Sequence, residues 1–211
     1  MALLIPASAW PQDRILGLLE VPALHEYVNA GGLDKSSGTI TLRAEPSQSA
    51  SVVLQVEDRR QLESREHDYE QVSAVVYGRD YPRSGGLWYK LKVIGGGSRY
   101  GWVEHAAGME FRTTYALVTS RMAHLSSDWD RRLRESPNLE APSRILDLQD
   151  DPPSARVIDS FNPRGTNETW YLIAVIRGTC TGEPVEIVAT GWVPAYATNG
   201  GTTMWYFSRG C

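Results

Sequence analysis

The stretch WYKLKV at Trp88–Val93, followed by GWV at Gly101–Val103, returns further along the chain as WYLIAV at Trp170–Val175 and GWV at Gly191–Val193. Two other blocks precede each pair in the same order: LRAEP (Leu42–Pro46) and SAVVYGRD (Ser73–Asp80) before the first, LRESP (Leu133–Pro137) and SARVIDSF (Ser154–Phe161) before the second. The period of about 90 residues is too long for a solenoid repeat and suits a compact domain. The sequence therefore predicts one small domain that has been duplicated.

The repeated blocks have the residue pattern of β-strands. They are rich in β-branched and aromatic residues and are separated by turn-forming segments, such as GGGSR at Gly95–Arg99. The segment Ile15–Val28 precedes the first repeat and contains Pro22, which interrupts a helix, so we expect irregular chain or one short helical turn there. The charged segment Glu57–Glu70 is expected to consist of strand ends joined by an exposed loop. The predicted fold class is all-β.

The order of these blocks resembles the bacterial SH3 (SH3b) domain family. The residues of the first repeat that match its pattern are Leu42-Arg43, Pro46-Ser47, Trp88-Tyr89-Lys90-Leu91 and Gly101-Trp102-Val103. In the second repeat, Leu172 stands where the family usually has a basic residue. The resemblance implies small, strongly bent antiparallel barrels, but it implies no particular ligand, because this fold serves many functions. We therefore expect two tandem SH3-like barrels packed together, with an N-terminal extension over residues 1–35 and domains over residues 36–112 and 113–211.

Composition and charge exclude two classes of partner. The formal net charge is −4 and the isoelectric point is about 5.6, so we expect no surface for nucleic acid. No apolar run approaches the roughly 20 residues that span a bilayer, so we expect no membrane span. The N-terminal MALLIPASAW lacks a leading positive charge and a long apolar core, so we expect no signal peptide in this sequence.

The sequence also lacks the usual catalytic motifs. GxSxG, HExxH and a phosphate-binding loop motif are absent. The histidines lie far apart without the spacing of metal ligands: they are His25, His67, His105 and His124. The charge cluster Asp128–Arg134, with its three arginines, is most simply a solvated loop, and a phosphate or anion site is the alternative. We therefore predict a protein that is not an enzyme and has no cofactor or metal, whereas a cleft with converging carboxylates would favour an enzyme.

The chain contains two cysteines, Cys180 and Cys211. Cys180 falls in a hairpin that is longer in the second repeat, and Cys211 ends the chain after a predicted edge strand. Antiparallel neighbours in a small barrel would bring the two within disulfide distance, so we predict a Cys180–Cys211 disulfide, with two free thiols as the alternative. A disulfide requires an oxidising compartment, so the predicted localisation is periplasmic or extracellular.

Aromatic residues are the candidates for ligand binding. The chain has seven Trp and ten Tyr against three Phe, and rings with a polar edge suit grooves that bind peptides or sugars. The recurring rings are Trp88, Tyr89, Trp102, Trp170, Tyr171 and Trp192. They either line a groove or fill the cores of two small barrels, and strand alternation alone does not decide between the two.

These observations lead to a functional hypothesis. We predict a non-enzymatic binding module of the bacterial cell envelope, whose partner is a cell-wall fragment such as a peptidoglycan peptide or a glycan, or an envelope protein. The alternative is a protein–protein interaction scaffold or inhibitor that acts through its loop insertions, at Glu57–Glu70 and Gly178–Thr190.

Overall fold

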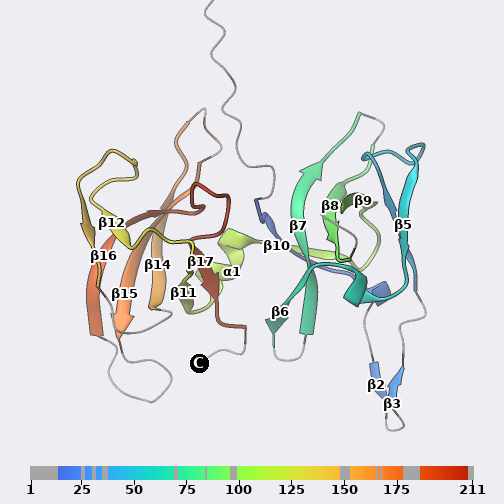
Figure 1. Ribbon diagram of the computed structural model, residues 1–211, viewed down its shortest axis with the longest axis horizontal. Coiled ribbons are helices and arrows are strands. Elements are labelled where there is room, and N and C mark those ends of the chain that lie inside the picture. Colours follow the sequence, from blue (N-terminus) through green and yellow to red (C-terminus); the bar gives the residue numbers. More distant parts are fainter. Residues whose placement is uncertain are drawn as a thin grey trace, which may run out of the picture. The chain divides into compact units, whose positions relative to one another are not determined.

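The computed structural model describes residues 14–24, 27–29, 32–34, 38–68, 71–83, 85–95, 99–147, 153–164, 166, 168–177 and 186–208. Within these residues the chain has two large antiparallel sheets, a separate hairpin and one short α-helix, α1 (Thr114–Ser120) (Figure 1). The prediction of an all-β fold is confirmed, and one of the two sheets forms a half-barrel. None of the described helices is long and apolar enough to cross a membrane.

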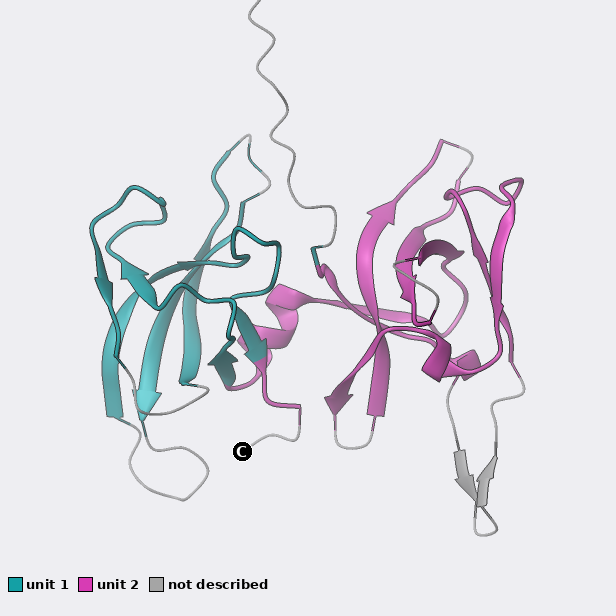
Figure 2. Ribbon diagram, in the orientation of Figure 1, with its two compact units in different colours: residues 1–14, 123–205 teal, residues 15–122, 206–211 magenta. Residues whose placement is uncertain are grey.

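The chain divides into two compact units (Figure 2). Unit 1 consists of residues 1–14 and 123–205, and unit 2 consists of residues 15–122 and 206–211. The chain therefore passes from one unit to the other after Arg14, after Met122 and after Trp205. Residues 15–35, which the sequence analysis places in an N-terminal extension, belong to unit 2. Each unit is thus built from more than one segment of the chain.

The large sheet of unit 2 has eight strands. Seven of them follow the order β10 (Glu110–Thr113), β1 (Gly17–Glu20), β7 (Gln71–Asp80), β8 (Trp88–Val93), β9 (Arg99–Glu104), β4 (Ile40–Arg43) and β5 (Val52–Val56), and β6 (Ser64–Asp68) pairs with β7. The unit also holds the 3-10 helices η1 (Pro22–Leu24) and η2 (Arg59–Gln61) and the hairpin of β2 (Tyr27–Asn29) and β3 (Gly32–Asp34). Its core includes the fully buried side chains of Leu19, Leu42, Val56, Val76 and Leu91.

The sheet of unit 1 has seven strands. Their order is β13 (Ser143–Ile145), β12 (Arg132–Arg134), β16 (Glu186–Pro194), β15 (Trp170–Arg177), β14 (Ser154–Phe161), β11 (Ala123–Leu125) and β17 (Met204–Tyr206). Tyr206, the last residue of β17, is assigned to unit 2. The buried apolar side chains of unit 1 include Leu125, Leu133, Ile173, Val193 and Met204.

The two sheets have corresponding strand orders. The order β5-β4-β9-β8-β7-β1-β10 matches β13-β12-β16-β15-β14-β11-β17, and the repeated sequence blocks occupy corresponding strands. One irregularity also corresponds, because β7 shifts register between Val76 and Gly78, and β14 shifts between Val157 and Asp159. The duplicated sequence therefore forms two sheets with the same connectivity.

Strand β1 differs from the expectation drawn from the sequence. Irregular chain or a helical turn was expected over Ile15–Val28, but Gly17–Glu20 forms β1 between β10 and β7. Leu18 and Leu19, on opposite faces of this strand, are both buried. A short 3-10 helix does follow, at Pro22–Leu24. The expectation failed because β1 acquires its strand partners from segments that lie far away in the sequence.

The charged segment between β5 and β7 also contains more structure than expected. Its described part forms η2 and β6 rather than only strand ends and exposed loop, and β6 buries the imidazole of His67. The Nδ1 of His67 lies 2.8 Å from the Oγ of Ser73, which is also buried. Burial lowers the pKa of His67, and the charge of Arg112 lowers it further, while Glu20 and Asp68 act in the opposite direction. The neutral imidazole is therefore the form that the fold favours.

We expect His67→Asn to reduce the loss of stability below neutral pH. Because the pKa of His67 is lower in the folded state, the unfolded chain binds the proton more readily. The contribution of the neutral ring is therefore complete above the unfolded pKa of about 6.5 and is lost as the pH falls through the folded value. Urea unfolding between about pH 7.5 and about pH 5 measures the effect. Equal slopes for His67→Asn and the wild type would contradict the expectation.

Two glycines allow neighbouring strands to approach closely. A Cβ at Gly101 would lie 2.6 Å from the Cβ of Leu42, and a Cβ at Gly191 would lie 2.8 Å from the Cβ of Leu133. Both glycines belong to the repeated GWV block, and both lie where the strand from the Leu-Arg block meets it, β4 beside β9 and β12 beside β16. The glycine of this block is therefore a steric requirement in each unit.

Gly191→Ala is expected to destabilise unit 1 by roughly 1–3 kcal/mol, because the added methyl group would overlap the side chain of Leu133. Thr190→Ala, at the neighbouring exposed position of β16, is the matched control and should change the free energy of unfolding by about 0.5 kcal/mol or less. Urea unfolding followed by tryptophan fluorescence measures both variants. If Gly191→Ala were as stable as the wild type, β12 and β16 would not need this close approach.

Candidate functional site

The predicted ligand-binding residues separate onto the two faces of each sheet. Four of them are buried, Trp88, Tyr89, Trp170 and Tyr171, whereas Trp102 and Trp192 are partly buried. Tyr89 belongs to the core cluster of unit 2, and Tyr171 pairs with the buried Val193. Because successive residues of a strand point to opposite faces, Trp88 and Trp170 lie on the other side. The tyrosines therefore fill the cores, and the tryptophans remain as lining residues of the opposite face.

The tryptophans of each unit share one face. In unit 1, Trp192 lies opposite Leu172, two residues beyond Trp170, so Trp170 and Trp192 occupy diagonal positions on neighbouring strands. Trp88 and Trp102 have the same arrangement in unit 2. Each unit therefore carries two of the predicted tryptophans on one face, at diagonal positions of neighbouring strands.

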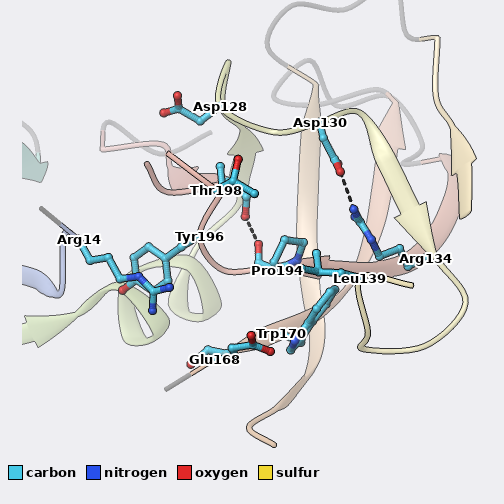
Figure 3. Close-up of a pocket in the computed structure, with 13 residues that line it drawn as sticks. Arg14, Asp128, Asp130, Arg134, Leu139, Glu168, Trp170, Pro194, Tyr196 and Thr198 are labelled. Carbon is cyan, nitrogen blue, oxygen red and sulfur yellow. Dashed lines mark hydrogen bonds and ion pairs between the residues drawn. The ribbon is translucent and has the colours of Figure 1, made fainter. Parts of the chain in front are cut away.

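A cavity of about 130 Å³ lies beside Trp170 in unit 1 (Figure 3). Its apolar walls include Leu139, Trp170, Pro194 and Tyr196. Trp170 and Pro194 are opposite each other on β15 and β16, so the regular pairing of these strands positions one wall. Leu139 is 51% exposed and therefore lies at the mouth of the cavity.

Arg134, the last residue of β12, is the buried cation of this cavity. Only 6% of its surface is exposed. Its Nη2 donates to the Oδ2 of Asp130 at 2.6 Å, while its Nε and Nη1 are buried and have no hydrogen-bond partner among the described residues. The guanidinium carbon lies 5.9 Å from the ring centroid of Trp170. One ion pair thus holds the guanidinium in place, and further N–H groups remain uncommitted.

Trp170, the first residue of β15, adds another donor. Its side chain is 1% exposed, and its indole Nε1 has no hydrogen-bond partner in the part of the chain that the structure describes. A buried polar group without a partner costs roughly 1–3 kcal/mol. The N–H groups of Trp170 and Arg134 are therefore available to acceptors that water or a ligand supplies.

Acidic side chains surround the same cavity. Asp128, Asp130 and Glu168 line it together with Arg14 and Arg134, so three negative and two positive charges give a formal net charge of −1. Figure 3 shows the guanidinium of Arg134 directed to the carboxylate of Asp130. The site therefore combines buried hydrogen-bond donors with a slightly negative lining, which distinguishes it from an open basic patch.

The positions of unit 2 that correspond to the mouth of this cavity carry different side chains. Gln48 stands at the repeat position of Leu139, and Glu104 pairs with Trp88 as Pro194 pairs with Trp170. The Nε2 of Gln48 donates to the Oε2 of Glu104 at 2.9 Å. A hydrogen-bonded amide and carboxylate thus replace the apolar pair of unit 1.

The arginine of the repeated Leu-Arg block also differs between the units. Arg43, the counterpart of Arg134, is only partly buried, and its Nη1 donates to the backbone oxygen of Ala50 at 2.8 Å. This bond uses a donor that is uncommitted at Arg134. Both repeats therefore have an arginine at this position, but Arg43 bonds to a backbone oxygen and Arg134 bonds to a carboxylate.

The sequence singled out the charged cluster that contains Arg134, but it favoured a solvated loop over an anion site. The cluster Asp128–Arg134 was expected to be a solvated loop, and this interpretation is wrong for Arg134, which is buried at the end of β12. A signal was present, because Arg134 follows Leu133 in a block that the first repeat places on a strand. Its burial depends on the ion pair with Asp130 and on the neighbouring strand, which no local pattern reveals.

Two other expectations concern cysteines and metals. Cys180 and Cys211 lie outside the described residues, so the Cys180–Cys211 disulfide stays a prediction. Among the residues that the structure describes, no group of three or more His, Cys, Asp or Glu side chains is arranged to hold a metal ion. The candidate site is the cavity beside Trp170.

The Asp130–Arg134 ion pair should stabilise the fold more than an exposed pair does. Asp130→Asn removes the charge partner of a buried guanidinium, and we expect a loss of about 1–2 kcal/mol, moderated because the Asp130 side chain is 43% exposed. Glu186→Gln is the control, because both side chains of the Arg177–Glu186 pair are 63% exposed, and it should change stability by about 0.5 kcal/mol or less. Urea unfolding gives both values, and equal losses would show that burial of Arg134 adds nothing to its ion pair.

No protein-family model matches the chain, and no curated protein or solved structure is significantly similar to it. Function is therefore inferred from the residues and the geometry of the cavity in unit 1.

Proposed function

We propose that this protein is a non-enzymatic binding module of the bacterial cell envelope, located in the periplasm or outside the cell, and that its two units are SH3-like barrels. The ligand is a cell-wall fragment, either a peptidoglycan peptide or a glycan, and it binds in the cavity of unit 1. One observation carries the proposal: the buried N–H groups of Arg134 and Trp170 have no partner among the described residues.

The composition of the cavity suits a small organic ligand. Binding pockets in proteins are mostly apolar and contain a few well-placed polar groups. Here Leu139, Pro194 and Trp170 provide apolar surface, and the polar donors come from Trp170 and Arg134. Peptides and glycans offer the complement, because their carbonyl, carboxylate and hydroxyl oxygens accept hydrogen bonds and their apolar faces pack on aromatic rings.

The position of the site on the sheet supports a binding role. Arg134 and Trp170 belong to strands β12 and β15, which lie on either side of β16. Residues on paired strands are held more rigidly than residues on loops, so the donors are positioned before a ligand arrives. The resemblance of the repeated blocks to the SH3b family supports the assignment to the cell envelope.

A scaffold that acts through its loop insertions is the weaker candidate. In the insertion between β5 and β7, the backbone oxygen of Glu66 accepts from the Oη of Tyr206 at 2.9 Å, and that of His67 accepts from Nη1 of Arg121 at 3.1 Å. All four residues belong to unit 2, so this insertion contributes contacts inside its own unit. Residues 178–185 of the other insertion lie outside the described residues.

The full-length protein should cosediment with isolated peptidoglycan sacculi. Leu139→Ala should weaken this binding by about threefold to fivefold, because apolar contact at the mouth of the cavity is lost. Gln48→Ala changes the corresponding position of unit 2 and should bind as the wild type does. Binding curves at fixed protein and increasing sacculi measure the apparent affinities.

Sacculi that have been stripped of peptides by an amidase separate the two ligand classes. Retained binding would identify a glycan, and lost binding would identify the peptide. Failure of the wild-type protein to cosediment with intact sacculi would refute the proposed role in the envelope.

A further inference from the structure

We infer that the cavity of unit 1 binds a free carboxylate carried on a small apolar group, as at the C-terminal end of a peptide. Arg134 and Trp170 supply the hydrogen bonds, and Leu139 and Pro194 contact the apolar group. This inference rests on the proposed binding site and names the chemical class of its ligand.

The uncommitted groups of the cavity determine the polarity of the ligand. The guanidinium of Arg134 and the indole N–H of Trp170 donate hydrogen bonds and accept none. The guanidinium carbon lies 5.9 Å from the indole ring centroid, so the two side chains are neighbours in the lining of one cavity. A carboxylate has two oxygens with lone pairs in different directions, and bonds from a guanidinium to a carboxylate are strengthened by charge. A carboxylate can therefore satisfy both side chains at once.

The charge of the lining favours a monoanion over a polyanion. Asp130 already accepts from Nη2 of the Arg134 guanidinium, and the N–H groups on Nε and on Nη1, which point in different directions, remain without a partner among the described residues. Asp128 and Glu168 add negative charge to the same lining. A phosphate dianion would be repelled by all three carboxylates, whereas a carboxylate brings a single charge to the uncommitted donors. The ligand class is therefore a carboxylate.

The size of the cavity limits what accompanies the carboxylate. Its volume is about 130 Å³, and an engineered protein cavity of about 150 Å³ holds one benzene molecule. The space therefore accommodates a carboxylate with one small side chain, such as the methyl group of alanine. The exposed position of Leu139 at the mouth leaves a way out for the rest of the peptide.

Unit 2 provides an internal comparison. Glu104 pairs with Trp88 where unit 1 has Pro194, so a carboxylate ligand would meet a like charge there. Arg43 already donates from Nη1 to the backbone oxygen of Ala50. The same strand arrangement therefore favours carboxylate binding in unit 1 and opposes it in unit 2.

The test uses the isotope-labelled full-length protein with three probes: N-acetyl-alanyl-alanine, its C-terminal amide, and inorganic phosphate. Nuclear magnetic resonance follows the indole N–H signal of Trp170 through each titration. We expect the free acid to shift this signal to saturation, because the indole N–H gains an acceptor. The amide should bind at least about tenfold more weakly than the free acid, because it lacks the charge that pairs with Arg134.

Two variants at the mouth test the sign of the charge without altering the buried donors. Both variants lose the leucine contact and differ in charge, so Leu139→Lys should bind the free acid about tenfold more tightly than Leu139→Glu does. Leu139 is half exposed, so both variants are expected to fold. Gln48→Lys and Gln48→Glu make the matched changes in unit 2 and should leave the affinity unchanged.

Each alternative result has a defined meaning. The inference is overturned if the free acid does not bind, if the amide binds as tightly as the acid, if phosphate binds more tightly, or if the acid shifts the indole signal of Trp88 instead. Binding to sacculi without preference for the acid would remove this inference and leave the proposed function. Binding of the acid at Trp170 without binding to sacculi would support the inference and remove the proposed function.

Discussion

The close approach of β12 to β16 at Gly191 is the constraint on which the candidate site depends. Because Gly191 has no side chain, Leu133 packs directly against β16, and the two strands pair at Arg134 and Trp192. This pairing positions the backbone of Arg134 beside the cavity, and the ion pair with Asp130 then orients its guanidinium. A larger residue at Gly191 would displace the strand that carries the buried cation, so the steric constraint and the chemistry of the site are linked.

The same constraint operates in unit 2, where Gly101 lies against Leu42, yet the chemistry there is different. The strand order corresponds between the units, as does the bulge in the block that forms β7 and β14. The side chains that surround Trp88 differ from those that surround Trp170. The two units thus share the interactions that specify the backbone, while the residues at the mouth of the unit 1 cavity differ from those at the corresponding positions of unit 2.

The donors around Trp170 conflict with the rule that buried polar groups have partners. Regular interiors satisfy almost all such groups, and exceptions are concentrated where a protein binds or reacts. The arrangement is consistent with a fold that accepts a loss of stability at one place for the sake of binding. The ion pair with Asp130 limits that loss, because it satisfies Nη2 of the guanidinium while Nε and Nη1 remain without a partner among the described residues.

Much of the fold follows from the sequence alone. The repeated blocks predicted an all-β chain and located β4, β7, β8 and β9 and their counterparts β12, β14, β15 and β16, because strand formation depends on residue type and on turn residues such as those of GGGSR. Four aromatic positions of the predicted set do lie together as tryptophan pairs. Three features were decided only by the tertiary structure: the strand at Gly17–Glu20, the choice of the face with Tyr171 as the core face, and the burial of Arg134. Each depends on partners that are distant in sequence, because strand pairing, the choice of the buried face and the burial of a charge are set by non-local contacts that no local pattern contains.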